Sequence, residues 1–148
     1  MSTTILHLIP FDPSHVPTNT KQQTTKALLN ILFPSKEIEL VITEETIFID
    51  SGQYFTNVHC HLCGDVVKIE IWQDAMDAAY NTRFRDLTFT TPCCSRETSL
   101  NSLDYKMPSG FSRFMIIIRD LETELSIQNL QQIEKAMGCH LREIWTRY

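Results

Sequence analysis

Two short segments hold most of the side chains that could do chemistry. The stretch "HCHLCG" at 59–64 contains two thiols and two imidazoles and ends on a glycine, and "TPCC" at 91–94 contains two adjacent thiols. Thiolate and imidazole are the ligands that Zn²⁺ prefers, and a structural zinc site takes four of them in a tetrahedron. We therefore expect one structural Zn²⁺ per chain, bound by Cys60, Cys63, Cys93 and Cys94.

The first segment favours a metal-binding turn over a redox pair. A redox CxxC sits at the N-terminus of a helix, where the helix dipole lowers the thiol pKa. Here strand-like residues precede the motif at 54–59 and follow it at 66–71, which predicts the bend of a β-hairpin. Gly64 permits the positive φ that such a turn needs after its second thiol.

The second segment differs from a CxxC pair because its thiols are adjacent. Neighbouring side chains of an extended strand point to opposite faces, so both can reach one ion only if the backbone turns, as Pro92 suggests. The interval from Cys63 to Cys93 also exceeds the roughly 15 to 20 residues usual in such sites. A variant site with His61 or His59 in place of one thiol of this pair stays open, as does a set of four free thiols. Cys139 stands apart, and we expect it to be a small core residue.

Elements in the order β-α-β are predicted at each end of the chain, which indicates an α+β fold. Apolar periodicity, Pro10, Pro34 and a final Gly138 bound these elements, and Ser126 is expected to cap the second helix. Two such units form a ferredoxin-like split β-α-β sheet. The expected strands are 4–9, 38–43, 46–50, 114–119 and 141–148, and the expected helices start near 19 or 20 and at 126.

Residues 51–110 are predicted to be a zinc-ribbon-like insertion within a single domain, 1–148. This insertion holds the four candidate ligands and a predicted amphipathic helix, 72–81, whose apolar side includes Trp72 and Met76. So small a unit has little core of its own. We expect metal binding to supply much of its folding free energy, on the order of 10 kcal/mol.

Composition restricts the partners. The chain has 148 residues, a net charge of −5 and an apolar content of 43%, as expected of a globular protein. Its acidity argues against tight binding to a phosphate backbone. Basic residues outnumber acidic ones at 81–119, so a nucleic-acid module acting through Arg83, Arg96 or Arg113 is one alternative, and a solvated surface is the other. Neither an export signal nor a membrane span is predicted, and five cysteines without such a signal indicate the reducing cytoplasm.

No known catalytic motif is complete. The deaminase pattern H-x-E with P-C-x-x-C fails because His59 and His61 lack the glutamate and Arg96 stands where its last cysteine would be. The sequence thus favours a binding or regulatory protein, with a protein partner contacted through the insertion and no predicted catalytic residue. A metal-dependent hydrolase with an open position on the same zinc is the enzymatic alternative. Phe111 and Phe114 are expected in the core rather than on a binding surface.

The middle of the chain resembles a family of uncharacterised bacterial proteins of similar length, which have CPxCG at the first turn and PCCG at the second. This sequence departs from that pattern at His61, where proline is usual, and at Ser95, where glycine is usual. The resemblance implies a zinc-ribbon-like segment and no particular activity. The matching residues are Cys60, Cys63, Gly64, Trp72, Met76, Pro92, Cys93, Cys94, Leu103, Tyr105, Pro108, Gly110, Phe111 and Phe114.

Overall fold

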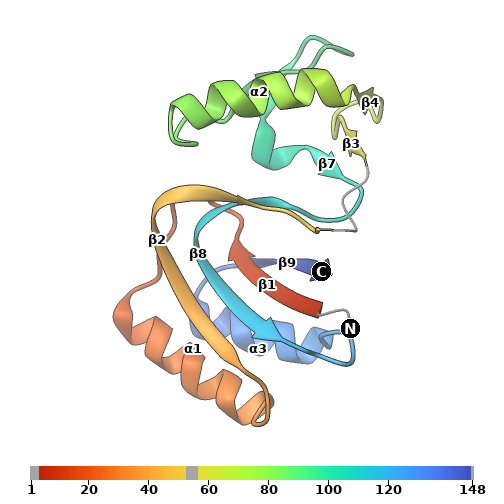
Figure 1. Cartoon of the computed structure of the whole chain (residues 1–148). Coiled ribbons are helices and arrows are strands. Elements are labelled where there is room, and N and C mark those ends of the chain that lie inside the picture. The colour runs from red at the N-terminus through yellow and green to blue at the C-terminus, as the bar shows by residue number, and fades with distance from the viewer. Residues whose placement is uncertain (1–3, 53–56, 148) are drawn as a thin grey trace.

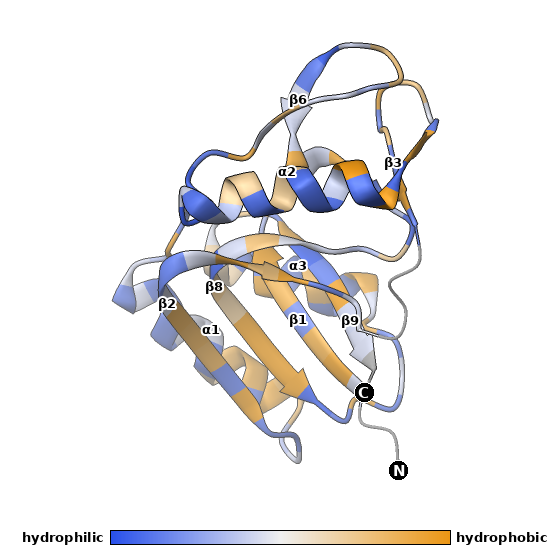
Figure 2. Ribbon diagram, turned by 45° about the horizontal axis from the view of Figure 1, so that its top comes forward, coloured by the Kyte–Doolittle hydropathy of each residue, from blue (hydrophilic) through white to orange (hydrophobic). Residues whose placement is uncertain are grey.

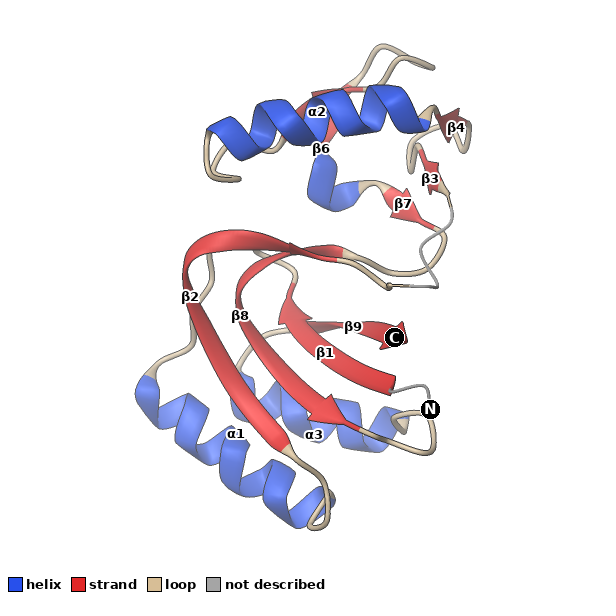
Figure 3. Cartoon of the chain, in the orientation of Figure 1, coloured by secondary structure: helices blue, strands red, loops and turns tan. Residues whose placement is uncertain are grey.

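The computed structural model describes residues 4–52 and 57–147 and has an α+β architecture (Figures 1 and 3). The N-terminal part contains β1 (Thr4–Pro10), α1 (Asn19–Leu32) and β2 (Ile38–Ile49). The C-terminal part contains β8 (Gly110–Arg119), α3 (Ile127–Met137) and β9 (Leu141–Arg147). Between them lie β3 (Val58–His59), β4 (Val66–Val67), α2 (Ile69–Asn81), β5 (Thr88–Thr90), β6 (Glu97–Ser99), the 3₁₀ turn η1 (Leu100–Ser102) and β7 (Asp104–Tyr105).

The four long strands form one antiparallel sheet in the order β2-β8-β1-β9. Alternate residues of these strands face α1 and α3, which lie on one side of the sheet (Figure 1). Burying each such Leu, Ile or Phe side chain contributes about 1.5–3 kcal/mol. The central strands β1 and β8 are hydrophobic over much of their length, whereas β9 is more mixed (Figure 2). The core on this side contains Leu6, Leu8, Leu29, Ile38, Phe114, Ile116, Ile118, Ile133, Met137 and Leu141.

The ends of α1 and α3 follow local sequence signals. The Thr18 side chain accepts a hydrogen bond from the Lys21 amide at the start of α1, and the Ser126 side chain accepts one from the Asn129 amide at the start of α3. Gly138 ends α3 in the left-handed conformation, with φ of 76°. The predicted starts of these two helices and the two caps at Ser126 and Gly138 are confirmed.

Several predicted boundaries were wrong. The last long strand before α3, expected to start at 114, begins at Gly110. Strands were expected at 38–43 and 46–50, separated by the acidic pair Glu44 and Glu45. The structure has a single strand here, β2, from Ile38 to Ile49, and the acidic pair only shifts its register with β8, between Ile42 and Ile47. Residues 66–71 are not one strand, because pairing stops after Val67 and α2 begins at Ile69. The helix α2 therefore begins three residues earlier than its predicted start at 72. Of the expected strand 54–59, residues 54–56 lie outside the described part.

The segment between β2 and β8 lies on the side of the sheet away from α1 and α3 (Figure 1). Its core is continuous with the sheet, because Phe48 of β2 packs against Trp72 of α2 with ring centroids 5.8 Å apart. Phe111 of β8 is fully buried in the same cluster, 4.9 Å from the Phe48 ring. Burial of Phe111 and Phe114 confirms that both aromatics belong to the core.

Arg142 of β9 also links the sheet to this segment. Its guanidinium donates hydrogen bonds to the carbonyl oxygens of Ser109, at 2.8 Å, and Asn101, at 3.2 Å. The same group lies over the Phe11 ring, 5.0 Å from its centroid. The side-chain amide of Asn101 in turn donates a hydrogen bond to the Phe11 carbonyl oxygen. Three separate stretches of chain are thus held at one point.

Within the described residues, every helix is too short or too polar to cross a lipid bilayer.

Candidate metal centre

The first cysteine turn joins β3 to β4, which pair in antiparallel register through Val58 and Val67. The Gly64 amide donates to the Cys60 carbonyl oxygen at 2.8 Å, and the Cys60 amide donates to the Asp65 carbonyl oxygen at 2.8 Å. These two bonds curl the backbone around the Cys60 and Cys63 side chains. Gly64 closes the curl with φ of 83°, a conformation open to glycine at little cost. The predicted turn in a hairpin is confirmed.

The second turn, between β5 and β6, has the same backbone pattern. The Ser95 amide donates to the Thr91 carbonyl oxygen at 2.9 Å, and the Thr91 amide donates to the Arg96 carbonyl oxygen at 2.9 Å. Ser95 has φ of 54° and therefore takes the left-handed place that Gly64 takes in the first turn. By position in the turn, Thr91 corresponds to Cys60 and Cys94 corresponds to Cys63. Cys93 corresponds to Leu62, so this ligand candidate has no matching cysteine in the first turn.

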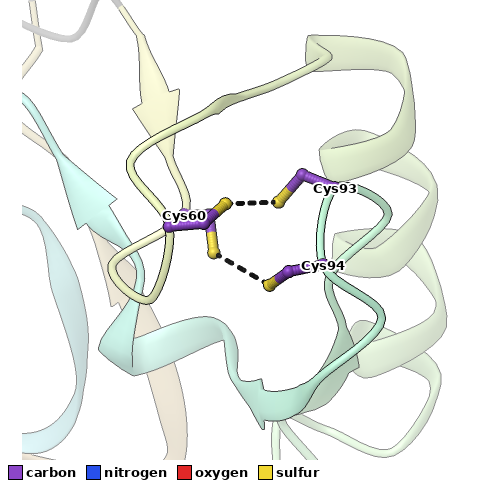
Figure 4. Close-up of side chains that lie close together, drawn as sticks. Cys60, Cys93 and Cys94 are labelled. Atoms are coloured by element: carbon purple, nitrogen blue, oxygen red, sulfur yellow. Dashed lines mark hydrogen bonds between the residues drawn. The ribbon is translucent and has the colours of Figure 1, made fainter.

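The two turns face one another and bring the four sulfur atoms together. All four Sγ atoms lie within 4.8 Å of one another. Cys63 Sγ is 3.1 Å from Cys93 Sγ, and Cys60 Sγ is 3.8 Å from Cys94 Sγ. Figure 4 shows Cys60 from one turn pointing toward Cys93 and Cys94 from the other. Among the described residues, this is the cluster of metal-ligating side chains that the structure assembles.

The cluster has the dimensions of a tetrahedral thiolate site. A zinc–sulfur bond of about 2.3 Å places neighbouring sulfur atoms of a tetrahedron about 3.8 Å apart. The distance between Cys60 Sγ and Cys94 Sγ matches that edge, and the other pair is closer. Four cysteines able to bind one metal ion are therefore present, as predicted from their spacing.

Hydrogen bonds and proximity give these thiols unequal acidities. Burial of the Cys60 thiol raises its pKa, but the backbone N–H groups of Cys63 and Leu62 outweigh that effect and lower the pKa to about 6. The sulfur of Cys63, together with burial, raises the pKa of Cys93 to about 12. Several thiolates so close together repel one another, and a divalent cation bound among them would offset this repulsion.

Neither nearby histidine belongs to the sulfur cluster. The His59 Nδ1 atom lies 3.1 Å from the Gly64 carbonyl oxygen, and the His61 Nε2 atom lies 3.3 Å from the Thr98 hydroxyl. The His59 contact lies within the first hairpin, whereas the His61 contact joins the first hairpin to the second. The remaining cysteine, Cys139, is half-buried beside the core of α1 and α3.

Three arginines of the basic segment lie around one cavity, together with acidic side chains. This cavity of about 530 Å³ is lined by Arg83, Arg85 and Arg113 and also by Asp12, Glu44 and Glu45. Arg83 pairs with Glu45 at 3.1 Å, and the Arg113 side chain donates to the Thr43 carbonyl oxygen. Arg96 belongs to the second cysteine turn. The cavity therefore mixes both signs of charge.

Thr91 was not among the predicted site residues. This side chain is fully buried, and its hydroxyl lies 3.0 Å from Cys94 Sγ and accepts a hydrogen bond from the Arg96 amide. It thus orients a candidate ligand while supporting the turn. Writing "CHLCGD" above "TPCCSR" reveals the correspondence, with proline directly after Thr91.

Comparison of the chain with protein-family models, with curated proteins and with solved structures gave no match in any of the three. The geometry of the cysteine cluster is therefore the basis for inferring a function.

Proposed function

We propose that this protein is a small binding or regulatory protein whose insertion is held in shape by one structural Zn²⁺ on Cys60, Cys63, Cys93 and Cys94. The observation that carries the proposal is the approach of all four Sγ atoms to within 4.8 Å. Four thiolates suit a closed structural site, because they leave no position for water. A reducing compartment such as the bacterial cytoplasm keeps such thiols free to bind metal.

The proposed domain organisation is a ferredoxin-like split β-α-β sheet with a zinc-ribbon-like insertion at about 51–110. The strand order β2-β8-β1-β9 and the helices that precede β2 and β9 support this assignment. Two hairpins with matching cysteine turns support the comparison with a ribbon. The packing of Phe48 on Trp72 supports a single domain, since the insertion and the sheet share a core.

Native mass spectrometry tests the metal assignment. Purified, reduced protein is expected to carry one zinc ion per chain and to lose it with a strong chelator, and elemental analysis identifies the ion. The Cys60→Ser variant should carry far less metal, whereas the matched Cys139→Ser variant should retain a full equivalent. The proposal would be overturned if the purified protein contained no metal or if both variants lost the same amount of metal. One equivalent of iron per chain would identify the bound ion as iron instead of zinc.

The insertion is also the proposed surface for a protein partner. It exposes several apolar side chains close to the first cysteine turn, among them Leu62 at 40% and Val66 at 59% exposure. A rigid, metal-braced turn presents such side chains with little loss of conformational entropy on binding. No contact among the described residues specifically favours the hydrolase or the nucleic-acid alternative.

A comparison of two surface variants tests the location of the partner site. Partners recovered with the intact protein from its own cells should be lost with Val66→Ser. They should persist with Ile127→Ser, which changes a 73% exposed side chain on α3. Equal recovery with Val66→Ser and with the intact protein would place the partner surface elsewhere.

A further inference from the structure

The four candidate ligands differ in their access to solvent. The Cys60 side chain is 0% exposed, and Cys94 is half-buried. Cys63 and Cys93 are both exposed. A small solute that reaches the centre therefore meets Cys63 and Cys93 before the other two.

The two exposed thiols are also the closest pair. Their Sγ atoms are 3.1 Å apart and come from different turns. A disulfide requires a sulfur separation of about 2.05 Å, so an approach of about 1 Å would be enough to form the bond. The competing pair of adjacent residues, Cys93 and Cys94, would form a strained eight-membered ring. The second pair across the turns, Cys60 and Cys94, is farther apart at 3.8 Å and shielded.

The position of Cys93 in its turn explains its exposure. The matching backbone pattern gives the inward-facing first position to Thr91, which is 0% exposed. Cys93 stands at the third position, where the first turn has Leu62, a side chain 40% exposed. One candidate ligand is therefore supplied from the outer side of the turn.

We propose that Cys63 and Cys93 form a peroxide-sensitive oxidation site, in which a disulfide between them replaces two ligands and releases the metal ion. This inference rests on the proposed metal centre. It adds a regulatory step to that centre, because oxidation would remove the ion that shapes the proposed partner surface.

The chemistry needs a hydroperoxide and no other reactant. In the metal-loaded protein the ligating thiols are held as thiolates, whatever their pKa without the metal, because only the deprotonated form binds the ion. The Cys93 thiolate attacks one peroxide oxygen, the O–O bond breaks, and the products are Cys93 sulfenic acid and hydroxide. The Cys63 thiolate then attacks the sulfenic sulfur, forming the S–S bond and releasing a second hydroxide. Two electrons pass from the two sulfurs to the peroxide, and two protons from solvent convert both hydroxides to water. Cys60 and Cys94 remain as two thiolates, too few for a structural zinc site.

The test starts with the metal content of the whole protein and then adds hydrogen peroxide. A chromogenic chelator should report release of one equivalent of metal, and thiol titration should show a loss of two thiols per chain. After tryptic cleavage without reduction, peptide 37–68 should remain linked to peptide 86–96 by the disulfide. Fragmentation of the linked peptides in the mass spectrometer should locate the bond between Cys63 and Cys93. A dithiol reductant with added zinc should restore the metal. The Cys139→Ser variant should behave in the same way.

The outcomes separate the two proposals. Protein that carries no metal before peroxide is added contradicts the proposed function. Protein that carries metal and keeps it in a large excess of peroxide, or that cross-links Cys60 to Cys94 or Cys93 to Cys94, leaves the metal centre intact as a proposal and overturns the oxidation site.

Discussion

Thr91 holds, in the second cysteine turn, the place that Cys60 holds in the first. The carbonyl oxygen of each residue accepts a hydrogen bond from the backbone N–H of the residue four positions later. The backbone N–H of each residue donates a hydrogen bond to the carbonyl oxygen of the residue five positions later. Both are fully buried. The site therefore has two turns of one kind, but one of them presents its thiols from the third and fourth positions.

The first prediction concerns two substitutions that transfer a thiol from position 93 to position 91 of the second turn. Cys93→Ser should weaken zinc binding by more than the roughly 10- to 100-fold that loss of an outer partner costs. Adding Thr91→Cys should restore most of that loss, because the Thr91 hydroxyl already lies 3.0 Å from Cys94 Sγ. Competition with a chelator of known affinity measures both variants, with Cys139→Ser as the control. A double variant no better than Cys93→Ser would contradict the correspondence between the turns.

The second prediction concerns removal of the metal. When the concentration of free zinc is about a thousand times its Kd, binding raises the free energy of unfolding by about 4 kcal/mol. A chelator that removes the zinc should therefore lower Tm by about 10 °C. Hydrogen exchange should locate the effect, with lost protection in β3, β5 and β6 and retained protection in β1 and β8. These last two strands have hydrogen-bonded partners on both sides. Uniform loss of protection through the sheet would show that the sheet depends on the metal as well.

The third prediction tests the link between β9 and the insertion. Arg142→Met removes donors to the carbonyl oxygens of Ser109 and Asn101 while retaining much of the apolar stem. Buried acceptors then lose a charged partner, so the free energy of unfolding should fall by about 2–3 kcal/mol. Urea denaturation measures the change. Arg85→Met, at an exposed position, should alter it by no more than about 0.5 kcal/mol.

The fourth prediction concerns pH and His7 in the sheet. Burial lowers the pKa of the His7 imidazole, the Arg119 guanidinium lowers it further, and Asp50 opposes the shift. Its neighbours across the strands are Ile117 and Ile144. The unfolded chain thus binds the proton more readily than the folded chain. The free energy of unfolding should fall as pH drops through about 6.5, and the fall should level off below the folded-state pKa.

Replacement of the imidazole isolates this contribution. His7→Phe should reduce the difference in stability between pH 7 and pH 5, measured by urea denaturation with a chelator present so that metal binding does not contribute. His140→Phe changes an 88% exposed ring and should leave the difference unchanged. An unaltered pH dependence in His7→Phe would assign it to other groups.

Much of the fold could be predicted from local patterns. The extents of β1 and α1 and the caps at Ser126 and Gly138 depend on residues within a few positions of one another. Predictions failed where a distant partner decides the outcome. Pairing with β8 carries β2 through the acidic pair that was expected to separate two strands, and burial of Trp72 against Phe48 accompanies an earlier start of α2.

The candidate site divides in the same way. The thiol spacing and Gly64 were enough to predict the first turn, because its two closing hydrogen bonds join residues within six positions of sequence. The second turn was predicted only as a bend, and the role of Thr91 was not predicted. The sequence segments can be aligned so that Thr91 matches Cys60, but only the folded chain shows the shared backbone hydrogen bonds and the Thr91 hydroxyl 3.0 Å from Cys94 Sγ.

By itself, the sequence determined the types of chemistry available, the local turns and the helix ends, since adjacent residues control backbone conformation directly. Only the tertiary structure decided which sulfur atoms meet, which two stay exposed, and how Arg142 holds the insertion to the sheet. Those relationships depend on the packing of segments far apart in the chain, where many weak apolar contacts act together.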